Sequence, residues 1–82
     1  MPRYFFDIHN GNGPSVDEHG LVLSSPDRIM RETSRILLDI ARDELPGQDG
    51  GEITIFVRDD AGNEICKTHL SFKTEWKNFE TN

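Results

Sequence analysis

Apolar and polar residues alternate along three stretches of the chain, which is the pattern of strands that bury one face. The stretches are residues 3–9, 52–58 and 64–72. A shorter apolar run at residues 20–23 predicts a fourth strand, and its shortness is typical of a sheet edge. Residues 10–15 are dense in Asn, Gly and Pro, so they predict the turn of a hairpin.

One further stretch has the periodicity of a helix. Between residues 26 and 45, apolar residues recur every three or four positions. Ser25 is placed to accept the free N–H groups of the first turn, and Pro26 suits the first helical position. Pro46 disfavours helical geometry in the residue before it, so the helix is expected to end near residue 45.

The predicted elements follow one another in the order ββαββ. This order predicts an α+β fold, a four-stranded antiparallel sheet with one helix packed on one face, in a single domain of residues 1–82. The first and third strands carry apolar residues on both faces, which predicts that they are the central pair. The expected spatial order is second, first, third and fourth, with every neighbour antiparallel and a right-handed helical crossover.

One helix covers only one face of such a sheet, so the other face is expected to be open. The alternation assigns to this face Phe5, Asp7, His9, Phe56, Arg58, Lys67 and His69. Two phenylalanines on the central strands of an uncovered sheet are unusual for a monomer. Three explanations compete: the tail, residues 73–82, folds back with Trp76 or Phe79; two copies pack sheet to sheet; or another protein binds there.

Charge and cysteine content narrow the classes of partner. The chain has nine Lys and Arg residues and fifteen Asp and Glu residues. The resulting net charge of −6 at pH 7 repels nucleic acid and anionic membranes at long range. No apolar stretch approaches the roughly 18 residues of a membrane span. Cys66 is the only cysteine, which excludes an intrachain disulfide and fits a reducing compartment. We therefore expect a cytoplasmic protein whose partner is another protein or a second copy, with no nucleic-acid or membrane partner.

One hairpin gathers side chains that are able to carry chemistry. Asp7, His9, Asp17 and Glu18 crowd the first predicted hairpin, so one hypothesis is a small-ligand or metal-dependent enzyme that uses them. A calcium loop beginning at Asp7 fails at its sixth position, which is Asn12 where glycine is required. The composition is more typical of turn formation.

The single cysteine forms no catalytic pair by its spacing. Cys66 and His69 lie three positions apart on one predicted strand, so their side chains point to opposite faces. One cysteine and three scattered histidines provide no zinc-ligand pair. We therefore predict no catalytic residue, metal ligand or cofactor. The leading hypothesis is a small non-enzymatic interaction or regulatory module, with a homodimer through the open sheet face as one of its forms.

Four segments carry a resemblance to a known family. They are the opening Pro2-Arg3-Tyr4-Phe5-Phe6-Asp7-Ile8-His9-Asn10-Gly11, then Asp17-Glu18-His19-Gly20, Ile40-Ala41-Arg42-Asp43-Glu44-Leu45-Pro46 and Val57-Arg58-Asp59-Asp60-Ala61-Gly62. In this order they resemble a family of short, uncharacterised bacterial proteins that is common in soil α-proteobacteria and classed as a domain of unknown function. The resemblance covers residues 2–72 and implies a bacterial cytoplasmic protein. It implies no activity, cofactor or catalytic residue.

Overall fold

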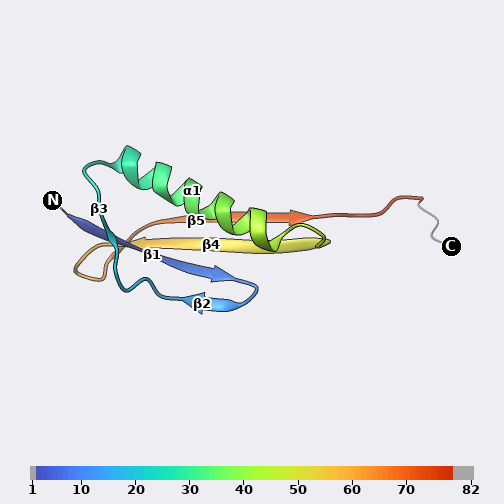
Figure 1. Cartoon of the computed structure of the whole chain (residues 1–82), viewed down its shortest axis with the longest axis horizontal. Helices are drawn as coiled ribbons and strands as arrows, with labels where there is room; N and C mark the ends of the chain where they lie inside the picture. Colours follow the sequence, from blue (N-terminus) through green and yellow to red (C-terminus); the bar gives the residue numbers. More distant parts are fainter. Residues whose placement is uncertain (1, 79–82) are drawn as a thin grey trace.

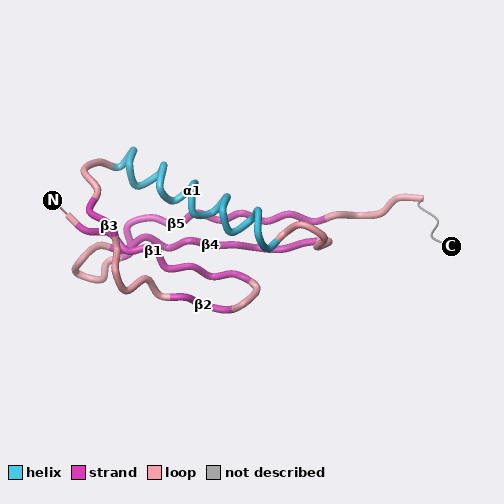
Figure 2. Tube along the Cα trace, viewed as in Figure 1, coloured by secondary structure: helices cyan, strands magenta, loops and turns pink. Residues whose placement is uncertain are grey.

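The computed structural model describes residues 2–78 and has an α+β architecture with one helix and one antiparallel sheet (Figure 1). In chain order the elements are β1 (Arg3–Asn10), β2 (Gly13–Ser15), β3 (Leu21–Val22), α1 (Pro26–Glu44), β4 (Gly50–Arg58) and β5 (Glu64–Lys73). The helix runs along one face of the sheet, and the other face carries no further layer from the described residues (Figure 2).

The helix begins where its capping residues predicted. Ser25 is the N-cap, and its side-chain oxygen accepts the N–H of Arg28 at 3.3 Å. The helix ends at Glu44, one residue earlier than predicted, and the N–H of Leu45 closes the last turn on the carbonyl of Ala41. The Glu44 carboxylate accepts a hydrogen bond from the side-chain amide of Asn10 at 2.9 Å, which ties this end of the helix to β1.

Replacing Ser25 with alanine is expected to lower the free energy of unfolding by about 1 kcal/mol, because a free N–H of the first turn loses its acceptor. Thermal unfolding followed by circular dichroism measures the loss. Ser24 is the matched control, since it is exposed and caps nothing in the structure. Equal losses in the Ser24→Ala and Ser25→Ala proteins would contradict the capping role.

The central pair of strands is the predicted one, but within residues 2–78 the sheet has five strands rather than four. The hydrogen-bonded order is β2-β1-β4-β5, and β3 also pairs with β1. The predicted turn is confirmed at Gly11 and Asn12 and wrong for residues 13–15, because Gly13, with φ of 95°, closes the turn early and residues 13–15 return along β1. The predicted strand 20–23 is reduced to two residues.

Both β2 and β3 lie on the same edge of β1, and a loop of residues 16–20 separates them. The remaining strands are one or two residues longer than predicted, since β1 reaches Asn10, β4 begins at Gly50 and β5 reaches Lys73. The backbone of these added residues still finds a partner strand, which alternation of side chains alone does not reveal.

The hydrophobic core lies between α1 and the central strands. Its buried members are Phe6, Ile29, Leu37, Ile53, Ile55 and Val57. The buried Thr33 hydroxyl donates to the carbonyl of Ile29 at 2.7 Å, so this polar group is satisfied within the helix. Within residues 2–78, no helix has the length and apolar character needed to cross a lipid bilayer.

The described part of the tail continues past the end of β5 instead of turning back across the sheet (Figure 1). Trp76 lies in this segment with 69% of its surface exposed. Phe79 lies outside the described residues. Trp76 therefore does not provide the cover over Phe5 and Phe56 that one of the three explanations required.

Candidate functional site

The seven residues predicted for the open face lie on three neighbouring strands, and we call this surface the open face. Cross-strand pairs join them: Phe5 with Arg58, Asp7 with Phe56, and Phe56 with Lys67. His9 and His69 are both paired with Thr54, from β1 and β5 respectively. The alternation of side chains therefore brings all seven residues into one connected surface.

A cation covers the first phenylalanine of the open face. The guanidinium carbon of Arg58 lies 4.6 Å from the centre of the Phe5 ring. The Nε of Arg58 donates to Asp7 Oδ2 at 2.7 Å, and Nη2 donates to the carbonyl of Asp17 at 2.9 Å. The hydrogen bond to Asp7 raises the pKa of Arg58. Phe5 is thus half-buried beneath an arginine that is held in place from two sides.

Asp17 bridges the break between β2 and β3. Its Oδ2 accepts the N–H of Phe6 at 3.1 Å, and its Oδ1 accepts the N–H groups of His19 at 3.0 Å and Gly20 at 3.1 Å. Its own N–H donates to Asp7 Oδ1 at 2.9 Å. Burial on its own would raise the pKa of Asp17, but the backbone donors of Gly20, Phe6 and His19 outweigh it and hold the pKa below its ordinary value.

The second phenylalanine lies at the centre of the open face. His9 approaches the Phe56 ring edge-on, with ring centres 6.4 Å apart and an angle of 70° between the planes. Lys67 Nζ lies 5.8 Å from the centre of the same ring. Lys67 forms no ion pair with any described residue, in contrast to Arg58. This half-buried ring therefore carries a cation that is still available to an anion.

Two further residues join this part of the open face. Thr54 Oγ1 and His69 Nδ1 lie 2.8 Å apart, and His69 Nε2 lies 3.4 Å from a carboxylate oxygen of Glu52. Neither Glu52 nor Thr54 is among the seven residues predicted for the open face. The sequence does contain a signal for them: alternate residues of a strand point to the same face, so Glu52 and Thr54 lie on the face of Phe56 and Arg58.

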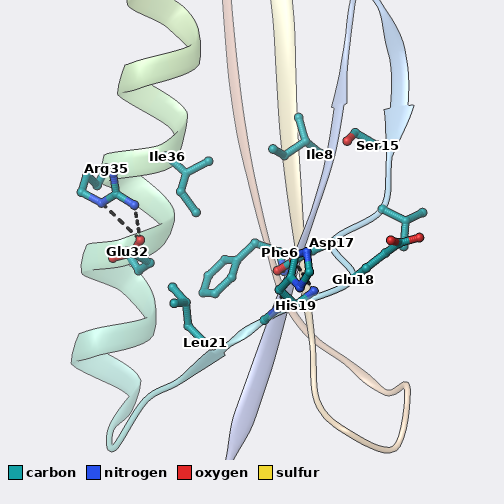
Figure 3. A pocket seen from close by; sticks show the side chains of 12 residues that line it. Phe6, Ile8, Ser15, Asp17, Glu18, His19, Leu21, Glu32, Arg35 and Ile36 are labelled. Carbon is teal, nitrogen blue, oxygen red and sulfur yellow. Dashed lines mark hydrogen bonds and ion pairs between the residues drawn. The ribbon is translucent and has the colours of Figure 1, made fainter.

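A cavity lies on the other side of the sheet, between α1 and the edge formed by β2 and β3 (Figure 3). It has a volume of about 510 Å³, and Phe6 and Ile36 point into it from the strand and the helix. Arg35 on its rim is already paired with Glu32 and with Asp39. The arginine on this rim is therefore already neutralised by two carboxylates, and we do not place the functional site there.

The residues of the enzyme hypothesis are divided between these two surfaces. Asp7 and His9 lie on the open face, while Asp17 and Glu18 line the groove. Asp7 and Asp17 meet at the sheet edge, where main-chain and guanidinium donors occupy their oxygens. Within residues 2–78, no group of three His, Cys, Asp or Glu side chains gathers to hold a metal ion.

Cys66 belongs to the helix side of the sheet and packs against the core. Burial, together with the charge of Glu64, raises the pKa of its thiol, which favours the protonated and less nucleophilic form. His69 is engaged with Thr54 on the opposite face. The structure therefore keeps this cysteine and this histidine apart.

A family comparison places the chain among related sequences. Residues 3–71 match the family described as Domain of unknown function (DUF6894). The chain belongs to this family. The matched region contains all seven open-face residues and Asp17, and it ends before the tail. No curated protein and no solved structure matches the chain.

Asp17 has a role at this site that differs from the predicted one. Asp17 was assigned to turn formation or to a metal site, whereas its carbonyl holds Arg58 and its N–H holds Asp7. These contacts join residues far apart in the chain. An acidic residue followed by Gly20 and a short apolar run was the local signal, because such residues accept the N–H groups of a following turn.

Proposed function

We propose that this protein is a small non-enzymatic interaction module that binds an acidic segment of another protein on its open face. The observation that carries the proposal is the pair formed by Phe56 and Lys67. A half-buried ring on a central strand lies beside a cation that has no carboxylate partner among the described residues. An acidic segment with apolar residues would satisfy both groups at once.

The rest of the open face is suited to a rigid contact. Arg58 is held over Phe5 by Asp7 and by the carbonyl of Asp17, so its position is set before a partner arrives. Preorganised side chains lose less conformational freedom on binding. Arg58 and Phe5 would therefore form the fixed part of the surface, and Lys67 would be the part that responds to charge.

The same charges argue against two other occupants of this face. Two copies packed sheet to sheet would enclose Lys67 of each copy, a cation with no carboxylate partner among the described residues of its own chain, and burying such a charge is costly. Single-stranded nucleic acid binds by stacking its bases on aromatic rings, and Arg58 and Lys67 already lie over the Phe5 and Phe56 rings. We therefore favour an acidic protein segment, met in the cytoplasm.

The test is an NMR titration with a synthetic peptide of alternating Glu and Leu, in wild type and in two variants. Lys67→Glu removes the available cation of the open face. Arg31→Glu makes the same change in total charge on the exposed side of α1. Lys67→Glu is expected to weaken binding roughly tenfold or more, while Arg31→Glu leaves it within about twofold.

Three results would count against the proposal. Equal weakening by both variants would mean that the peptide responds to total charge alone. Shifts in the groove with none around Phe56 would place the contact elsewhere. A stronger response to an oligouridine than to the peptide would replace the acidic segment with single-stranded RNA as the occupant.

A further inference from the structure

The outer edge of β5 is a row of main-chain groups with no strand beside it among the described residues. The N–H of Thr74 donates to the carbonyl of Asp49, on the β4 side. Main-chain groups alternate along a strand, so the even-numbered residues face β4 and residues 67, 69 and 71 face outward. The edge is regular over residues 66–73 and contains no proline, so nothing in its backbone blocks a further strand.

The helix carries exposed apolar side chains on the flank nearest this edge. Glu32, Arg35 and Ile36 line the groove on the β1 side of α1 (Figure 3). The period of 3.6 residues places Met30 and Leu38 on the other side of the helix, toward β5. They are 68% and 59% exposed, the largest apolar exposures on the helix. A free strand edge and an apolar helix flank therefore lie on the same side of the molecule.

The helix and β5 can be aligned along their lengths. A Cβ on Gly51, the cross-strand partner of Phe72, would lie 2.8 Å from Leu45 Cδ2, so Leu45 and Phe72 are at the same height. Going back from Leu45 to Ser34 covers about 16 Å of helix, and going back from Phe72 to Thr68 covers about 13 Å of strand. Ser34 on the helix is thus roughly level with Thr68 on the strand.

From these positions we infer that two copies of the chain join through antiparallel pairing of β5 with β5 of the second copy. The two copies are related by a two-fold axis that lies between the two β5 strands, beside Thr68 and level with Ser34. Such an axis is perpendicular to the sheet, so both helices lie on the same side of the joined sheet. Met30 and Leu38 lie one turn before and one turn after Ser34. Each Met30 therefore faces Leu38 of the second copy.

The side chains of β5 fit this register. Thr68 lies opposite Thr68 of the second copy, Cys66 lies opposite Leu70, and Lys67 lies opposite His69. Moving the axis to Lys67 would place two lysines in direct contact, and moving it to Leu70 would place Lys67 opposite Lys73. The register centred on Thr68 avoids both of these contacts and agrees with the height of Ser34.

The pairing would also bury additional apolar surface, of which a small domain has little. Among the described residues the core has six that are apolar and buried, and Cys66 and Leu70 on the helix side of β5 are only partly buried. A second copy would cover them while leaving both open faces on one continuous sheet surface. The inference goes beyond the proposed function, since it concerns the edge of β5 and not the open face.

Disulfide trapping tests the axis and the register together. Across the paired edge, even-numbered residues form the non-hydrogen-bonded pairs, whose Cα atoms are about 4.5 Å apart, within disulfide range. In a Cys66→Ser background, Thr68→Cys is therefore expected to form a covalent dimer under mild oxidation. Ser71→Cys in the same background lies opposite Ile65 and is expected to stay monomeric on a denaturing gel. Cross-linking of Ser71→Cys, or none of Thr68→Cys, would overturn the register.

Sedimentation equilibrium of the untagged chain tests the association itself, with the native cysteine in place. The wild type is expected to have twice the chain mass of 9.4 kDa. Leu38→Glu is expected to weaken the dimer roughly tenfold or more, while helical circular dichroism is unchanged. Val16→Glu makes the same charge change at a residue 66% exposed on the groove side, and it should leave the dimer intact. A wild type that stays monomeric at every concentration, or equal weakening by both variants, would overturn the inference.

Discussion

Replacing Asp17 with alanine is expected to lower the free energy of unfolding by about 2–3 kcal/mol. The side chain accepts three main-chain N–H groups, from Phe6, His19 and Gly20. Those of Phe6 and Gly20 are partly buried, so water replaces the lost acceptor poorly. Urea denaturation followed by circular dichroism measures the change. Glu18→Ala is the matched control, because the neighbouring carboxylate is exposed and its replacement is expected to cost less than about 0.5 kcal/mol.

The charge of Asp17 adds a pH dependence to this result. Its pKa in the folded protein is below the ordinary value, so the ionised carboxylate stabilises the fold above about pH 4. This stabilisation is lost as the pH falls through the lowered pKa, where the folded protein takes up the proton. The stability difference between wild type and Asp17→Asn is therefore expected to shrink below about pH 4. A difference that stays constant down to pH 2 would contradict an ionised acceptor at this position.

Replacing Gly20 with alanine is expected to cost about 2–4 kcal/mol. Gly20 has φ of 68°, a left-handed conformation that disfavours any residue with a Cβ. A Cβ at this position would also lie 2.8 Å from the carbonyl oxygen of Tyr4 and 2.9 Å from Phe5 Cε2. The Tyr4 oxygen belongs to the strand backbone and has little freedom to move. Chemical denaturation measures the loss, and NMR shifts of Phe5 and Arg58 report whether the open face is disturbed.

A second glycine, Gly47, separates the cost of the left-handed conformation from the cost of the close approach to β1. Gly47 has φ of 84°, and no heavy atom beyond its two chain neighbours lies within 4 Å of the position its Cβ would take. Gly47→Ala is therefore expected to show the conformational cost alone, about 1 kcal/mol. The excess loss in Gly20→Ala then measures the close approach to β1. Equal losses in the two variants would mean that the loop of residues 16–20 moves away from β1 without cost.

The inferred dimer and the proposed open-face contact are compatible, and Leu38→Glu distinguishes them because it changes no residue of the open face. The two-fold axis keeps both open faces on the same side, so Lys67 of each copy lies near the centre of the joined surface. Leu38→Glu acts on the helix side of the sheet and Lys67→Glu acts on the open face. Loss of the dimer without loss of peptide binding would support a contact made by each copy alone.

Much of the fold follows from local patterns. Alternation identified β1, β4 and β5, and helical spacing between Ser25 and Pro46 identified α1, because these elements each bury one face and so need a regular apolar pattern. Residues 13–15 carry no such pattern. Glycine, proline and serine are typical turn residues, and their pairing with β1 depends on the partner backbone rather than on their side chains.

The properties of the open face also come partly from local patterns and partly from the tertiary structure. By itself the sequence determined which side chains share that face, since alternation along a strand is a local property of the backbone. Only the tertiary structure decided how they interact. Arg58 reaches Phe5 and Asp7 from the far half of the chain, and Asp17 joins them from a loop. Such contacts depend on strand order and register, which bring distant residues to within a few ångströms and which no local pattern encodes.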